Sequence, residues 1–102
     1  MMAMTQGEIL LQTEDVLIRI MRLQAHGATP WHRHTAVCDR MLLLEGRVVV
    51  ECRDPEEVVA LQHGDLCTVD SGRAHRVVNA GDRLARYLLI QGVGRYDFDT
   101  IV

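Results

Sequence analysis

The sequence predicts an all-β protein of the sandwich or barrel type, and three observations support that prediction. The chain holds about eight to ten short segments rich in Val, Ile and Leu, with turn-forming residues roughly every ten positions. No stretch of about a dozen residues shows an apolar period of 3.6 together with capping residues, as an amphipathic helix would. The length, 102 residues, is that of one domain.

The first two predicted strands occupy residues 8–13 and 15–23. Apolar residues fill both alternating sets of positions in the second strand: Val16, Ile18 and Ile20, and Leu17, Met21 and Leu23. Because successive side chains of a strand point to opposite faces, we expect this strand to be covered on both faces. The turn sequence Gly27-Ala28-Thr29-Pro30 follows it. Residues 1–6, before the first strand, are expected to be disordered.

Six further strands are predicted, each bounded by turn-forming residues: 40–44, 47–53, 58–61, 66–69, 75–79 and 84–91. Glu45-Gly46 separates the first two of these and favours a tight hairpin. The final residues, 93–102, fit no regular element. Their Tyr96, Phe98 and Ile101 either cover one end of a barrel or pack on a partner.

Composition and charge exclude several functions. The formal net charge of −3 argues against nucleic acid as a partner, since phosphates require a basic surface. All eleven basic residues are arginine, which rules out Schiff-base chemistry because no lysine is present. Ser71, the only serine, lacks the sequence context of a serine-hydrolase nucleophile.

The location expected from the sequence is the cytoplasm. No apolar run approaches the roughly 20 residues that cross a bilayer, which argues against a membrane protein, and the N-terminus lacks the pattern of a secretory signal. Cys38, Cys52 and Cys67 cannot all pair with one another and form no C-x-x-C motif. In a reducing compartment they are expected to be small buried hydrophobic residues.

Three of the five histidines occur in a context that favours a metal site. His32 and His34 are two residues apart after the Gly/Pro turn, so on an extended segment their rings point to the same side. Two such imidazoles can share one cation. Asp39 follows shortly after, and His75 opens a distant strand. The alternative is a barrel that keeps these residues without a metal.

These residues resemble the two motifs of the cupin superfamily. The first family motif is G, about five residues, then H-x-H-x(3,4)-E-x(6)-G. Gly27, His32, His34, Asp39 and Gly46 match it closely, with four residues between Gly27 and His32. The second, G-x(5)-P-x-G-x(2)-H-x(3)-N, is matched by Gly64, Asp70, Gly72, His75 and Asn79. The resemblance spans residues 25–79 and rests on both motifs together.

Two departures from the motifs are visible. The family's glutamate is Asp39, whose side chain is one methylene shorter, so its carboxylate either binds the metal directly or reaches it through a water. Cys38 also falls within the allowed spacing, but six residues separate Asp39 from Gly46, as the motif requires. The family's proline is replaced by Asp70, which affects a turn and not the metal.

The resemblance implies a double-stranded β-helix, or jelly-roll barrel, as a single domain over residues 1–102 with its core motifs at 27–46 and 64–79. It also implies one metal inside the barrel, held by His32, His34, Asp39 and His75. Three imidazoles and one carboxylate suit a divalent transition metal ion, namely Fe, Mn, Ni, Zn, Co or Cu. Small members of the family commonly form homodimers through N-terminal strands, here residues 9–11.

Strand alternation and proximity to the histidines predict the walls of a ligand cavity: Trp31, Met41, Leu43, Val77, Asn79 and Tyr87. For Trp31 a plain packing role is an equal alternative. The inward polar candidates are Asn79, Tyr87 and Arg86. The expected function is to bind or transform a small polar molecule at the metal. An enzyme of this kind would be a dioxygenase or an isomerase or lyase. The alternative is a non-catalytic ligand-binding or sensor protein, with or without its metal.

Overall fold

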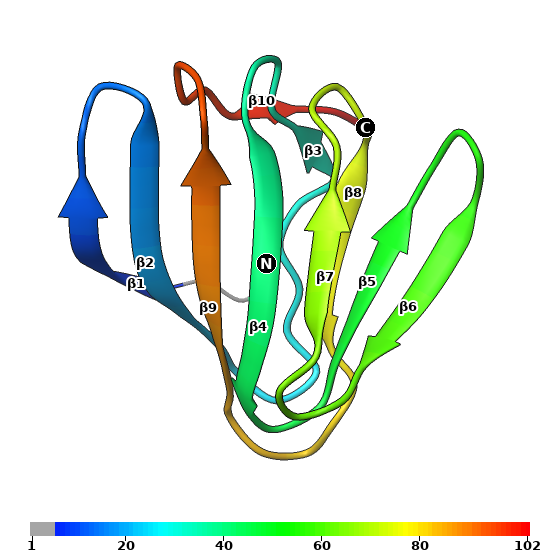
Figure 1. Cartoon of the computed structure of the whole chain (residues 1–102). Helices are drawn as coiled ribbons and strands as arrows, with labels where there is room; N and C mark the ends of the chain where they lie inside the picture. The colour runs from blue at the N-terminus through cyan, green and yellow to red at the C-terminus, as the bar shows by residue number, and fades with distance from the viewer. Residues whose placement is uncertain (1–5) are drawn as a thin grey trace.

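Two antiparallel sheets face each other (Figure 1). The computed structural model describes residues 6–102, which form ten strands and no helix. The order in the first sheet is β1 (Gln6–Gln12), β2 (Val16–Leu23), β9 (Ala85–Gly92), β4 (Cys38–Glu45) and β7 (Leu66–Val69). The order in the second sheet is β10 (Asp99–Thr100), β3 (His32–Arg33), β8 (His75–Asn79), β5 (Val48–Cys52) and β6 (Glu57–Leu61). The prediction of an all-β fold is confirmed.

Each of the eight strands predicted from the sequence is present, with ends that lie within two residues of the predicted ones. The short strands β3 and β10 are additional. Of the segment expected to be disordered, residues 1–5 lie outside the described residues, whereas Gln6 begins β1. No helix in the described part of the chain is long and apolar enough to cross a membrane.

The core lies between the two sheets and follows the alternation of the strands. In β5, Val48, Val50 and Cys52 are buried while the residues between them are only partly covered. β2 corrects one expectation, because its fully buried residues, Leu17, Met21 and Leu23, all lie on the inner face. Its outer residues Val16, Ile18 and Ile20 are half-buried.

The tight hairpin predicted at Glu45-Gly46 is wrong, because β4 pairs with β7 and β9 in the first sheet whereas β5 pairs with β6 and β8 in the second. The turn between β4 and β5 instead carries the chain from one sheet to the other, and it requires a glycine. Gly46 has a φ of +89°, a conformation that side chains with a Cβ rarely adopt. A Cβ at this position would also lie 2.9 Å from the Cα of Ala85, so β9 packs directly against the turn. The predicted turn is therefore present, but it joins the two sheets and is not a hairpin within one of them.

The C-terminal segment connects the two sheets across one end of the barrel (Figure 1). It leaves β9 in the first sheet and returns as β10, which pairs with β3 in the second sheet. Tyr96 and Phe98 on this segment line the internal cavity. For Tyr96 and Phe98, the covering of a barrel end is therefore observed.

Candidate metal centre

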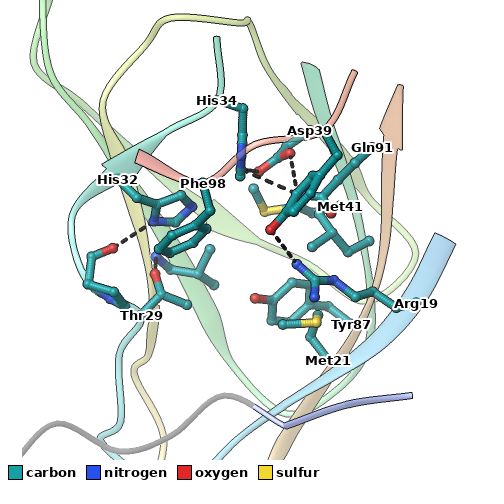
Figure 2. A pocket seen from close by; sticks show the side chains of 14 residues that line it. Arg19, Met21, Thr29, His32, His34, Asp39, Met41, Tyr87, Gln91 and Phe98 are labelled. Atoms are coloured by element: carbon teal, nitrogen blue, oxygen red, sulfur yellow. Dashed lines mark hydrogen bonds and ion pairs between the residues drawn. The ribbon is translucent and has the colours of Figure 1, made fainter. Parts of the chain in front are cut away.

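Four side chains from three strands and one loop converge inside the barrel. β3 supplies His32, and His34 follows one residue after its end, while β4 supplies Asp39 and β8 supplies His75. His32 and His75 are directly opposite each other in antiparallel register. All four residues are at most 4% exposed, and one donor atom from each lies within 4.8 Å of the others. Figure 2 shows His32, His34 and Asp39 around the cavity.

Backbone carbonyls fix the orientation of all three imidazole rings. The Nδ1 atoms of His32, His34 and His75 lie 2.7, 2.5 and 2.9 Å from the carbonyl oxygens of Pro30, Asp97 and Arg73, respectively. Because a carbonyl only accepts hydrogen bonds, each Nδ1 must carry a proton and donate it. In a neutral ring the Nε2 lone pair is then the free one. This is the tautomer that a metal ligand needs, held by the type of outer contact that orients metal-binding histidines.

The carboxylate of Asp39 reaches into the cluster despite its shorter side chain. Its Oδ2 atom lies 3.1 Å from His34 Nε2 and 2.9 Å from His75 Nε2. With both rings neutral, two lone pairs would face one anionic oxygen, so a cation must be present, either a proton or a metal ion. Ligands about 2.1 Å from one ion are separated by roughly 3.0–3.4 Å, which is close to these distances. The residues present therefore fit a small cation.

The electrostatics of the cluster differ from ring to ring. Burial lowers the pKa of His32 to about 4, so this ring is neutral at pH 7. Burial also acts to lower the pKa of His34, but the hydrogen bond and charge of Asp39 outweigh it and raise the pKa. For Asp39 itself burial acts to raise the pKa, and its hydrogen bonds with His34 and His75 reverse this and hold the pKa well below its usual range. The carboxylate is thus a fixed negative charge in the cluster.

Gln91 on β9 holds the other oxygen of the carboxylate. Its Nε2 donates to Asp39 Oδ1 at 3.0 Å, and β9 and β4 place the two residues directly opposite each other. The amide is 1% exposed, and its Oε1 is buried without a hydrogen-bond partner. Gln91 therefore orients Asp39 and leaves one acceptor at the wall of the cavity.

A cavity of about 370 Å³ lies against the cluster. This volume is at the small end of the range typical of small-molecule sites. Its walls are formed by Arg19, Met21, Thr29, Pro30, His32, His34, Asp39, Met41, Val77, Tyr87, Leu89, Gln91, Tyr96 and Phe98. The ring of Phe98 stacks on His32 at a centroid distance of 4.4 Å and an interplanar angle of 18° (Figure 2).

Three of the six residues predicted to line the cavity are found there: Met41, Val77 and Tyr87. Trp31, Leu43 and Asn79 do not line it. Leu43 and Asn79 do point inward, as alternation predicts, but they lie further along their strands. Leu43 packs in the apolar core, and the Asn79 amide donates to the carbonyls of Leu23, Gln24 and Arg83. Alternation predicts a face of the sheet but not a position along the strand.

For Trp31 the packing alternative is the one found, and for Arg86 the expected inward direction is corrected. Trp31 packs against arginines, with the guanidinium of Arg53 3.9 Å and that of Arg76 5.1 Å from the centre of its ring. Arg86, an inward candidate from the sequence, forms an ion pair with Glu45 on the surface. Neither side chain lines the cavity.

The sequence did not lead us to place Arg19, Gln91, Tyr96 or Phe98 in the wall of the cavity. A usable signal existed for two of them, because Arg19 alternates with the buried Leu17, Met21 and Leu23, and Gln91 alternates with the buried Tyr87 and Leu89. Polar residues in the inward set of an apolar strand are candidates for a site. No such signal existed for Tyr96 and Phe98, which come from a segment without periodicity.

Comparisons with known proteins identify the family and the fold. The profile of a family described as "Cupin domain" matches residues 19–91. No curated protein sequence matches the chain significantly. Among solved structures, an uncharacterized conserved protein with a double-stranded beta-helix domain from Klebsiella pneumoniae has a TM-score of 0.84 and 17% identity, covering 96% of this chain and 84% of that chain.

Two structures with named activities are also similar. The polyketide cyclase RemF from Streptomyces resistomycificus has a TM-score of 0.81 and 18% identity, covering 96% of this chain and 71% of that chain. An oxalate oxidase in complex with the substrate analogue glycolate has a TM-score of 0.83 and 14% identity, covering 95% of this chain and 55% of that chain. The chain thus spans about half of the oxalate oxidase. At these identities the likeness shows the fold, and it confirms the predicted double-stranded β-helix.

Proposed function

The chain belongs to the cupin domain family, and we propose that it binds one divalent transition metal ion through His32, His34, Asp39 and His75 and holds a small polar molecule beside it. The observation that carries the proposal is the orientation of the three imidazoles. Their protonated Nδ1 atoms are held by carbonyls, so three Nε2 atoms remain to act as ligands near one carboxylate. Three nitrogens and one oxygen suit Fe, Mn, Ni, Zn, Co or Cu.

The residues of the site have different roles in this proposal. The imidazoles and Asp39 hold the ion, Gln91 holds Asp39, and the cavity walls exclude water and shape the space for a ligand. A bound ion supplies a Lewis acid that attracts an oxygen atom of the ligand. Tyr87 stays protonated at neutral pH because burial raises its pKa well above the usual range, so its hydroxyl can donate a hydrogen bond but is no base.

A non-catalytic role and a catalytic role are both compatible with this proposal. Because the described cavity walls contain no free base apart from the proposed ligands, we place ligand binding first, as in a sensor or storage protein. The second candidate is a dioxygenase or an isomerase or lyase, which the cavity beside the cluster favours. The oxalate oxidase and polyketide cyclase of the same fold are named as enzymes. Oxygen uptake and product analysis with the metal-loaded protein distinguish the two roles.

The proposal is tested by elemental analysis of protein purified without added metal or chelator. We expect about one transition metal ion per chain. Protein that contains none, and that takes up none of the six ions on dialysis, would refute the proposal in favour of a barrel that lost its metal.

Metal affinity should weaken as the pH falls. The ion must displace the proton that Asp39 stabilises on His34, since ligand nitrogens must be neutral. Below the raised pKa of His34, affinity should therefore fall by about tenfold for each pH unit. The ring of His32, with its pKa lowered to about 4, adds nothing to this dependence near neutrality. Competition with a chelator between about pH 8 and about pH 5.5 measures the slope, and a flat profile would contradict the assignment.

We also propose that the chain forms a homodimer through β1. This strand is at the edge of its sheet, and its Ile9, Leu10 and Leu11 are 56%, 51% and 49% exposed. An edge strand with exposed apolar side chains favours pairing with another chain. Light scattering at micromolar concentration should give twice the mass of one chain. The substitution Leu11→Arg should lower the measured mass to that of a single chain.

Val58→Arg is the matched control for this test. Val58 is 69% exposed on β6, an edge strand of the other sheet. The substitution Val58→Arg should leave the dimer intact. A monomeric wild type, or an equal effect of the two substitutions, would refute the proposal. A cytoplasmic location, which the three free cysteines favour, remains part of the same proposal.

A further inference from the structure

Arg19 is an arginine on the inner face of the barrel. It lies on β2 between the buried residues Leu17 and Met21, and its side chain lines the same cavity as His32, His34 and Asp39. Figure 2 shows its guanidinium beside Tyr87. No other lysine or arginine contributes to the described walls of this cavity.

The guanidinium lacks an acidic partner. Among residues 6–102, no carboxylate oxygen lies within 4.0 Å of it, whereas Arg22 on the same strand pairs with Glu8 at 3.3 Å. The Nη2 of Arg19 donates to the hydroxyl oxygen of Tyr96 at 3.2 Å, and the Nε is buried without any hydrogen-bond partner. Leaving a buried charged donor unsatisfied is costly, so this arrangement favours a ligand that supplies the missing acceptor.

The charge of the whole site favours an anion. With a divalent ion in place of the cluster's proton, the neutral imidazoles and Asp39 carry a net charge of about +1, and Arg19 adds another. The cavity walls around this charge include Met21, Leu89 and Phe98. Because apolar walls exclude the water that would screen the charge, it attracts an anionic ligand strongly.

We propose that Arg19 binds the carboxylate of a small organic acid whose second polar group faces the metal cluster. This inference rests on the proposed metal centre and adds a class of ligand to it. The free Nε–H can donate to the carboxylate, and the geometry of a guanidinium suits a planar anion with two oxygens. Tyr96 accepts from Arg19 and so keeps its own O–H to donate. The unpartnered Oε1 of Gln91 accepts from a hydroxyl or amine on the ligand.

The test compares acids with their uncharged amides. Acetate, lactate, malonate and benzoate, each beside its amide, are titrated calorimetrically into the wild type, Arg19→Met and Arg22→Met. The wild type should bind at least one acid more tightly than its amide. Arg19→Met should lose about 10- to 100-fold in affinity for that acid and leave the amide unchanged. Arg22→Met, which removes a surface ion pair on the same strand, should behave as the wild type.

Two further measurements make the result decisive. Arg19→Lys keeps the charge without the planar donor pair, so it should retain the preference for acid and lose less affinity than Arg19→Met. Its circular dichroism and that of Arg19→Met should match the wild type. Equal binding of acids by the wild type and both variants, or no binding of any of the four acids, would overturn the role of Arg19.

The metal content of each variant separates this inference from the proposed function. Arg19→Met should hold as much metal as the wild type, because Arg19 is not among the proposed ligands. If the wild type holds no metal, the proposed metal centre fails, and the comparison of acids with amides is made on the metal-free protein. If the metal-free protein prefers acids and loses this preference in Arg19→Met, the inference about Arg19 stands. If the metal-free protein shows no such preference, the inference is refuted.

Discussion

Replacement of His75 by alanine should abolish metal retention while the protein remains folded. His75 supplies one of only three imidazole nitrogens, and its Nε2 lies 2.9 Å from the carboxylate that completes the proposed set. Loss of a partner that merely orients a ligand already lowers metal affinity by roughly 10–100-fold. Loss of a ligand should exceed that, to below the level at which the ion survives purification. Elemental analysis and circular dichroism of the purified variant measure the two expected results.

His63→Ala is the control for this variant. His63 is exposed in the turn before β7, so its removal changes the histidine count without touching the cluster. Its metal content should equal that of the wild type. If His75→Ala holds as much metal as His63→Ala, His75 is not a ligand and the assignment of the centre is wrong.

Asp39→Asn should lower metal affinity by more than about 100-fold. Asparagine keeps the size of the side chain and removes its charge, so the ion would lose its only anionic ligand in a buried site. Removing one partner of a buried ion pair costs about 3–5 kcal/mol, which corresponds to more than about 100-fold in affinity. A carboxylate that acted through a water would cost only roughly 10–100-fold. The size of the loss, measured by competition with a chelator, decides between direct and water-mediated binding.

The same variant has a second readout in the metal-free protein. Burial acts to lower the pKa of His34, and Asp39 is the larger of the two residues that raise it, ahead of Asp97, so the pKa should fall when the charge of Asp39 is removed. An NMR titration of the imidazole resonances measures this change. Asp70→Asn, an exposed acid in the turn after β7, should leave both readouts unchanged. An unchanged pKa of His34 in Asp39→Asn would contradict the proposed electrostatics.

The fold could be predicted because the strands and turns carry local signals. Runs of β-branched residues gave the strands, and glycine, proline and acidic residues gave the turns, as at Glu45-Gly46. The pairing of β2 with β9 and the partition into two sheets depend on contacts between distant residues. No local pattern encodes such contacts, so the strands and turns left a sandwich and a barrel open, and only the resemblance of the motifs favoured the barrel.

The cluster of His32, His34, Asp39 and His75 could be predicted because each of its residues matches a position of the two motifs. Direct binding of a metal by these residues stays a prediction. The cavity could be foreseen only in part. Alternation places Leu43 and Asn79 on the inner face. Where along a strand the cavity ends and the packed core begins depends on packing along the whole strand. The lining by Phe98 depends on where an irregular segment crosses the barrel, which its sequence does not encode.

An anomalous difference map from crystals of the protein, purified without added metal or chelator, tests the central claim most directly. The account predicts one strong peak about 2.0–2.3 Å from the Nε2 atoms of His32, His34 and His75 and from a carboxylate oxygen of Asp39. A map without a peak at this position, together with imidazole rings whose Nε2 atoms turn away from a common point, would contradict it.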